Sequence, residues 1–180
     1  MIRTTIFFIL VFTILLLTPA DFAQDKPLSI PGAPGCGAEN TKFDVRTAKG
    51  QHPTQPDSGK ALVYFIEDDS DFGSFPKPTT RIGLDGEWAG ATHGSSYFYI
   101  SVDPGVHHLC ANWQSAVLLG KGRQTAAAHF TADAGGAYYF EVKNTYWLDH
   151  GTASMSLKPL DSDQGQLLAS TFSSSIFHHK

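Results

Sequence analysis

The sequence predicts an all-β protein, an antiparallel β-sandwich of about seven to eight strands with a short C-terminal helix. From Lys60 onward, apolar and polar residues alternate with the period of two that strands require. The alternating runs are short and are separated by turn sequences rich in Asp, Pro and Gly. Only residues 161–170 break the pattern, so helices contribute little to the predicted fold.

A signal peptide is predicted over residues 1–23. Arg3 precedes an unbroken apolar run from Ile6 to Leu17, and small residues follow that favour cleavage near Ala20 or Ala23. The run is shorter than the ~20 residues that span a bilayer. We therefore expect a secreted or periplasmic protein whose mature chain has no transmembrane segment.

Residues 24–59 form a leader rich in proline and glycine, which gives no periodic apolar face. Within it, residues 41–46 alternate and fit a short edge strand. The two cysteines, Cys36 and Cys110, both lie in the exported part of the chain. In an oxidising compartment an even cysteine count favours a disulfide, which would attach the leader to the body of the protein.

The predicted sandwich domain covers residues 60–170, and its first half contains three recognisable features. Residues 61–66 are apolar on both faces, as in a central strand. Asp85-Gly86 is a strong hairpin signal. Residues 97–102 place Phe98 and its alternate neighbours on one side and tyrosines on the other, before Pro104-Gly105 makes a type II turn.

The second half repeats this scheme. Gly135-Gly136 is a turn, Phe140 and Val142 continue the inward face, and residues 152–157 alternate cleanly. Ser162 or Asp163 fits the N-cap of the short helix over residues 161–170. We assign residues 171–180 to a tail, or alternatively to a loose final strand.

Several of these segments together resemble an exported bacterial family called domain of unknown function 2846, whose small sandwich is similar to PEGA-like modules. The resemblance covers about residues 60–168. It is carried by the residues Thr80 to Gly86, Trp88 to Gly90, Ser96 to Phe98, Pro104 to His107 and Gly136 to Phe140. It implies an exported β-sandwich with no established activity. The chain lacks the lipid-attachment cysteine at the cleavage site that lipoprotein-like members carry.

Charge and motifs exclude some functions and leave others open. The net charge of −4 with scattered Lys and Arg gives no basic stripe for a nucleic acid. His93, His108 and His129 are the candidate zinc ligands, but no H-x-H or H-E-x-x-H spacing supports a metal site, and we expect no cofactor. His107 shares the parity of the core residue Leu109, which favours a structural role beside the turn.

Acidic residues at 67–71 and 161–163 alternate as in calcium loops, but neither segment completes the twelve-residue pattern. Hydrolytic motifs such as G-x-S-x-G are absent from the sequence. A metal-dependent hydrolase built on the histidines is the third hypothesis.

We expect a non-catalytic accessory or interaction module of the cell envelope that binds a protein or a glycan there. The alternative is a carbohydrate-binding module, because Tyr97, Tyr99 and Tyr139 are predicted to face away from the core and could stack on sugar rings together with Trp88. The competing interpretation is that these tyrosines are covered and belong to a core.

Overall fold

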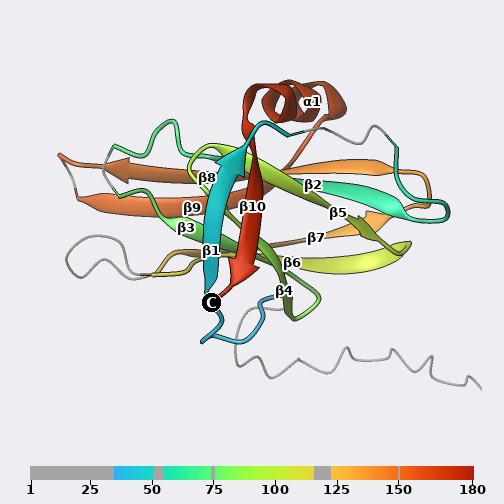
Figure 1. Cartoon of the computed structure of the whole chain (residues 1–180), viewed down its shortest axis with the longest axis horizontal. Coiled ribbons are helices and arrows are strands. Elements are labelled where there is room, and N and C mark those ends of the chain that lie inside the picture. The colour runs from blue at the N-terminus through green and yellow to red at the C-terminus, as the bar shows by residue number, and fades with distance from the viewer. Residues whose placement is uncertain (1–34, 51–54, 74–75, 116–122, 150) are drawn as a thin grey trace, which may run out of the picture.

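Two β-sheets facing each other and one short helix make up the described part of the chain (Figure 1). The structure is a computed structural model that describes residues 35–50, 55–73, 76–115, 123–149 and 151–180. The predicted signal peptide lies outside these residues. The elements, in chain order, are β1 (Phe43–Ala48), β2 (Ala61–Asp68), β3 (Thr79–Leu84), β4 (Glu87–His93), β5 (Ser96–Val102), β6 (Gly105–Trp113), β7 (Thr125–Ala132), β8 (Ala137–Trp147), β9 (Thr152–Leu160), α1 (Ser162–Thr171) and β10 (Ser173–His179).

Sheet A contains six strands in the order β1-β10-β5-β2-β8-β9, and sheet B contains four in the order β4-β3-β6-β7. The prediction of a mostly β protein with one short helix is confirmed, and β2 is the expected central strand. The prediction of a wholly antiparallel arrangement is wrong, because β2 pairs with β8, and β10 with β5, in parallel.

The predicted strand count is also wrong, since the described residues hold ten strands. Eight of them, β2 to β9, lie in the expected sandwich region. The two others are β1, where a short edge strand is expected within the leader, and β10, where a tail or a loose final strand is expected. β10 is rich in serine and histidine and has little apolar alternation, so its sequence gives a weak strand signal.

Strands β1 and β10 form an antiparallel ribbon that runs across the other strands (Figure 1). β10 pairs with β5 only at Ser173 and Ser174 and then diverges toward β4. There the Phe177 ring lies 5.1 Å from the Phe98 ring, and both rings occupy the space where a Cβ on Gly90 would be. The ribbon thus links sheet A to sheet B at one side of the sandwich.

The main hydrophobic core lies between the two sheets, and the alternation predicts its inward residues well. Its buried members come from strands of both sheets: Ala61, Val63, Phe65, Ile82, Phe98, Val102, Leu109, Ala111, Ala132, Phe140, Val142 and Leu157. Burial of aliphatic and aromatic side chains on this scale is the principal force that holds the sheets together.

The predicted turns adopt the backbone conformations that their residues favour. Asp85 and Gly86 have φ values of 52° and 94° and close the β3–β4 hairpin, as a primed turn requires. Gly105 also has a positive φ, of 141°. However, the turn at Pro104-Gly105 joins β5 of sheet A to β6 of sheet B rather than two paired strands.

A second hydrophobic core lies on the outer face of sheet A, beneath α1 (Figure 1). Leu62, Tyr64 and Ile66 of β2 are buried there. The N-cap of α1 is Asp161, one residue before the predicted cap, and its carboxylate accepts a hydrogen bond from the Gln164 N–H at 2.9 Å.

The helix approaches sheet A closely at Gly165, where a Cβ would lie 2.2 Å from Cγ of Tyr139. A Gly165→Ala substitution is therefore expected to destabilise the protein by about 1–3 kcal/mol, although Gly→Ala in a helix interior is normally stabilising. Urea unfolding measures the change, with Gln166→Ala on the exposed side of α1 as the control. A more stable Gly165→Ala protein would contradict this helix packing.

Candidate functional site

The cysteines form the expected disulfide, Cys36–Cys110, with Cα atoms 5.0 Å apart. It fixes residues 35–42 on the outer face of sheet B. Arg81, which is 2% exposed, holds the same segment by donating hydrogen bonds to the carbonyl oxygens of Glu39 at 2.9 Å and Thr41 at 2.7 Å. The disulfide and Arg81 therefore both attach residues 35–42 to sheet B.

Trp88 belongs to this attachment rather than to an open aromatic surface. Its indole N–H donates to the Ala38 carbonyl at 2.7 Å, and the Arg81 guanidinium carbon lies 4.2 Å from the ring centroid. This cation–π contact occupies one face of the indole. Trp88 is thus a structural contact of the N-terminal segment.

The structure does not place the predicted platform tyrosines on one exposed surface. Tyr97, Tyr99 and Tyr139 do face away from the main core, as the alternation indicates. Tyr97 is fully buried, and Tyr139 is half-buried and stacks on the Tyr64 ring at 5.0 Å. Tyr99 is 40% exposed. Helix α1 and the residues around Gly50 cover the rest of this face, which forms the second core.

The histidines do not converge on one point. His108 and His129 lie directly opposite each other on β6 and β7, with ring centroids 6.5 Å apart. His93 ends β4, at the other end of sheet B, where its Nδ1 lies 3.1 Å from the Pro78 carbonyl oxygen. In the described residues no three His, Cys, Asp or Glu side chains are grouped so as to hold a metal ion.

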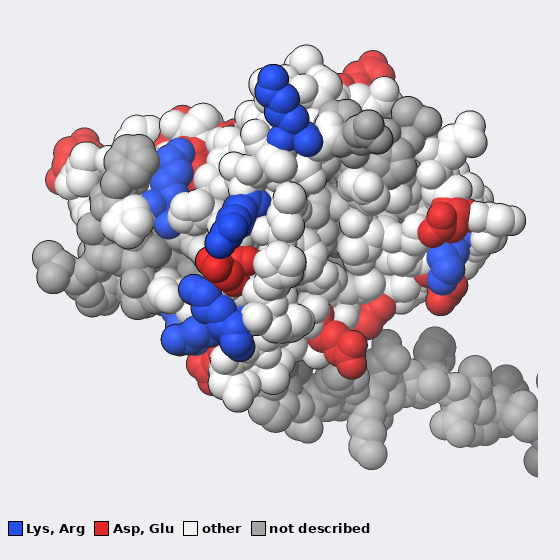
Figure 2. Space-filling model, viewed as in Figure 1, with Lys and Arg blue, Asp and Glu red and all other residues white. Residues whose placement is uncertain are grey.

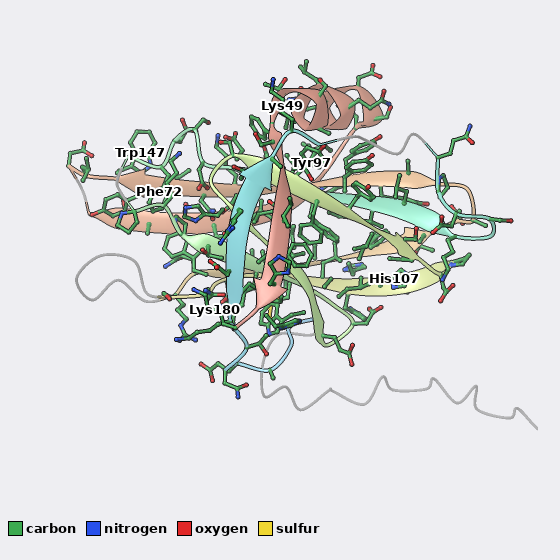
Figure 3. All side chains as sticks on the ribbon, in the orientation of Figure 1. Lys49, Phe72, Tyr97, His107, Trp147 and Lys180 are labelled. Carbon is green, nitrogen blue, oxygen red and sulfur yellow. A yellow bond between two sulfur atoms is a disulfide. The ribbon has the colours of Figure 1, made fainter. Side chains whose placement is uncertain are left out.

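His107 has the structural role that its parity predicts. Its ring nitrogens lie 2.7 Å from the Asp85 carboxylate and 2.7 Å from the Asp103 carbonyl oxygen, so the imidazole joins two turns. Burial by itself lowers the pKa of His107. The contacts with Asp85 and Asp103 raise the pKa by more than burial lowers it, so the net pKa lies above its usual value. In Figure 3, His107 lies at one end of the sandwich, and Phe72 and Trp147 lie at the other.

The acidic segment after β2 is neutralised by a lysine. The Lys143 ammonium lies 2.5 Å from the Asp68 carboxylate, 3.0 Å from that of Asp71 and 2.7 Å from the Ser70 hydroxyl. A cation from the chain itself therefore stands between the residues that resemble a calcium loop. This arrangement explains the acidic pattern as an ion-pair cluster.

Glu67 and Asp69 do not take part in the Lys143 ion-pair cluster. Both residues are completely buried. A single donor, the Asn144 amide nitrogen, contacts Oε1 of Glu67 at 2.6 Å and Oδ1 of Asp69 at 2.8 Å. The Thr80 hydroxyl also donates to Oε1 of Glu67, at 2.6 Å. The remaining oxygens, Oε2 of Glu67 and Oδ2 of Asp69, are buried without a hydrogen-bond partner.

The orientation of Asn144 is fixed by Trp113, whose indole N–H donates to the Asn144 carbonyl oxygen at 2.9 Å. An indole only donates, so the amide oxygen must face Trp113 and the amide NH₂ must face the carboxyl groups. An NH₂ group cannot ligate a cation. We call this group of residues the buried acid cluster; its members are Glu67, Asp69, Thr80, Trp113 and Asn144. The cluster can bind a proton and form hydrogen bonds, but its NH₂ group does not favour a metal ion.

Burial raises the pKa of both carboxyl groups in the buried acid cluster. For Glu67, burial and the nearby Asp69 charge raise the pKa well above its ordinary value, against the opposing effect of hydrogen bonds from Thr80, Thr92 and Asn144. For Asp69, burial raises the pKa to about 6, although the bond from Asn144 acts in the opposite direction. Two uncompensated charges in the interior are strongly unfavourable.

The buried acid cluster was not predicted, although the sequence contains a signal for it. Glu67 has the parity of the core residues Val63 and Phe65, and Asn144 has the parity of Phe140 and Val142. A polar residue that continues an inward apolar series is expected to find polar partners in the interior. The strand pairing that brings the two residues together cannot be read from either strand alone.

The buried acid cluster lies under one end of the sandwich, where β2, β4, β6 and β8 finish. We call this the loop end; its described residues are 69–73, 76–78, 94–95, 114–115, 123–124, 147–149 and 151. The Phe72 ring lies 5.7 Å from the rings of both Trp113 and Tyr146. Beyond them Trp147 and Leu148 are 55% and 67% exposed.

The charge on the rest of the visible surface is mixed. On the face shown in Figure 2, Lys and Arg side chains alternate with Asp and Glu over a mostly uncharged surface. None of the helices in the described ranges combines the length and the apolar character needed to cross a bilayer.

Comparisons of the chain with family models, with curated proteins and with solved structures gave no match.

Proposed function

We propose that this protein is an exported, non-catalytic interaction module of the cell envelope that binds a protein partner through its loop end. The observation that carries the proposal is the exposure of Trp147 and Leu148 at the tip of the β8–β9 hairpin. The predicted signal peptide and the disulfide support export. The resemblance to exported domains of unknown function is consistent with this role.

The loop end has the features expected of a recognition surface. Loops at one end of a sandwich are positioned by a rigid scaffold and commonly carry binding residues. Tryptophan is enriched among the residues that dominate binding energy at protein interfaces. Trp147 is held in place because the preceding residue, Tyr146, packs on Phe72 and its carbonyl oxygen accepts the Gly73 N–H at 3.1 Å.

A carbohydrate ligand is the second candidate, favoured by the exposure of Trp147 and Tyr99, because aromatic rings stack on sugars. These two side chains come from different surfaces, so a glycan that uses both is not expected. Each is testable by itself. The other predicted platform residues are buried or engaged in structural contacts.

The test places a photo-crosslinking amino acid at Leu148 and, as a matched control, at Val106. Val106 is also a strongly exposed apolar residue, 62% exposed, and lies at the opposite end of the sandwich. Illumination of cells that export the protein is expected to give a discrete protein adduct from position 148 and none from position 106. Equal labelling from both positions, or none from position 148, contradicts the proposal.

A Trp147→Ala substitution is expected to weaken binding of the crosslinked partner by at least about tenfold, while leaving the melting temperature within about 2 °C of wild type. Val106→Ala is the control and should bind normally. Isothermal titration calorimetry with the purified partner measures both. If a glycan raises the melting temperature instead and Trp147→Ala or Tyr99→Ala abolishes that shift, the carbohydrate alternative replaces the protein partner.

A further inference from the structure

The buried acid cluster has a property that binding at the loop end does not explain. Glu67 and Asp69 share one NH₂ group as donor, and neither carboxyl group forms an ion pair within the described residues. Two buried carboxylates in this position would repel each other at close range. Protonation of one of the two carboxyl groups removes this repulsion and converts one of its oxygens from an acceptor into a donor.

We propose that Glu67 and Asp69 together bind one proton in the folded protein, and that loss of this proton as the pH rises loosens the loop end. The proton passes to solvent and no other group is needed to balance the step. This inference concerns the fold alone and does not depend on the proposed partner.

Asp69 is placed to transmit the change. It is the first residue after β2, and its backbone N–H donates to the Ser95 hydroxyl at 3.3 Å. Its backbone carbonyl oxygen accepts a hydrogen bond from the Lys77 ammonium at 2.7 Å. Asp69 therefore joins the β2–β3 loop to the β4–β5 turn. Glu67 is held within a central strand, so repulsion between the two carboxylates displaces Asp69 and weakens both contacts.

Other charged groups modify the proton affinity without replacing the pair. Lys77 and His93 favour the ionised form of Asp69, and Asp68 disfavours it. Thr80, Thr92 and Asn144 contribute hydrogen bonds but no charge. The Lys143 ammonium is bound to Asp68, Ser70 and Asp71. His107 lies at the opposite end of the sandwich, which allows its titration to be separated by mutation.

The direction of the effect follows from linkage. The folded state binds the proton more tightly than the unfolded chain, whose carboxyl groups have pKa values near 4. The stabilisation is therefore complete below about pH 4 and is lost as the pH rises through about 6. The folding equilibrium constant of the wild-type protein therefore falls as the pH rises through this window.

The direct test is a ¹³C NMR titration of the side-chain carboxyl carbons in the wild-type protein between pH 4 and pH 8.5. At least one of the Glu67 and Asp69 carbons is expected to titrate with a midpoint at or above about pH 6. The Trp113 indole proton, bonded to Asn144, should shift with the same midpoint. The Trp88 indole proton, bonded to Ala38, is the internal control and should not follow it. Midpoints below pH 5 for both carboxyl groups overturn the proposal.

A mutational test follows the unfolding equilibrium by urea denaturation over the same pH range. Glu67→Gln is expected to flatten the fall in stability between pH 5 and pH 8, because the pair then holds a single ionisable group. Glu87→Gln changes an exposed residue in the same way and should parallel wild type. His107→Gln removes a histidine whose pKa is raised, and Glu141→Gln removes a carboxyl group whose pKa burial raises; the slope due to the pair should persist in both variants. A Glu67→Gln profile identical to wild type contradicts the inference; if this variant does not fold, the NMR titration still decides.

Discussion

An Asn144→Leu substitution is expected to lower the free energy of unfolding by about 4 kcal/mol or more at pH 7, although leucine has the same number and branching of side-chain heavy atoms. The substitution leaves the Glu67 and Asp69 carboxyl groups without their shared donor and the Trp113 indole N–H without its acceptor. Each buried polar group that loses its partner costs about 1–3 kcal/mol. Urea unfolding followed by circular dichroism measures the loss.

Two further variants test the hydrogen bonds of the cluster. Trp113→Phe removes the indole N–H that orients Asn144 and also leaves a cavity, so a loss of about 1–3 kcal/mol for the hydrogen bond is expected in addition to the cost of the cavity. Asn144→Asp replaces the NH₂ donor by a third carboxyl group, so stability should fall more steeply between pH 5 and pH 7 than it does in wild type. An Asn144→Leu protein within 1 kcal/mol of wild type would show that the buried acid cluster makes no net contribution.

Removal of the disulfide by Cys36→Ala together with Cys110→Ala is the second large effect. The bond closes a loop with a sequence separation of 74 residues. The chain-entropy account gives an upper estimate of about 4 to 5 kcal/mol for a loop of this length. Because Arg81 and Trp88 still hold the N-terminal segment, we expect residues 35–42 to become more accessible without unfolding of the sandwich.

Urea unfolding of the oxidised wild type, the reduced wild type and the double alanine variant measures this effect. The reduced wild type and the variant should agree, and the variant should not respond to reductant. Limited trypsin digestion at Lys42 reports on release of the segment. A loss below 1 kcal/mol would mean that the Arg81 contacts alone determine how this segment is attached.

The sequence was sufficient for the elements whose two faces differ in polarity. Alternation located β8, and turn chemistry located Asp85-Gly86 and Gly105; β2 was located by a run that is apolar on both faces. For β10 the sequence left a tail and a loose strand open, because its strand structure comes from pairing with β1 and β5 rather than from local preference. Alternation also cannot tell an exposed outer face from a covered one, so it leaves open whether Tyr97 and Tyr139 belong to a platform or to a core.

The candidate site was less accessible to prediction than the fold. The position of Trp147 near the end of a strand could be predicted from the sequence. The buried acid cluster depends on contacts between β2, β3, β6 and β8, which belong to two sheets. A small-residue spacing, Gly165 and Ala169 on one side of α1, was the available signal that a helix covers the tyrosines.

The pairing of β1 with β10 constrains the order in which the chain assembles. Among the described strands, β1 pairs only with β10, and Phe43 lies opposite His179. Because synthesis runs from the N-terminus, β1 is made well before its partner β10. Cys36 and Cys110 are available much earlier. A disulfide formed before β10 is in place would hold β1 close to the position that it occupies in the completed sheet.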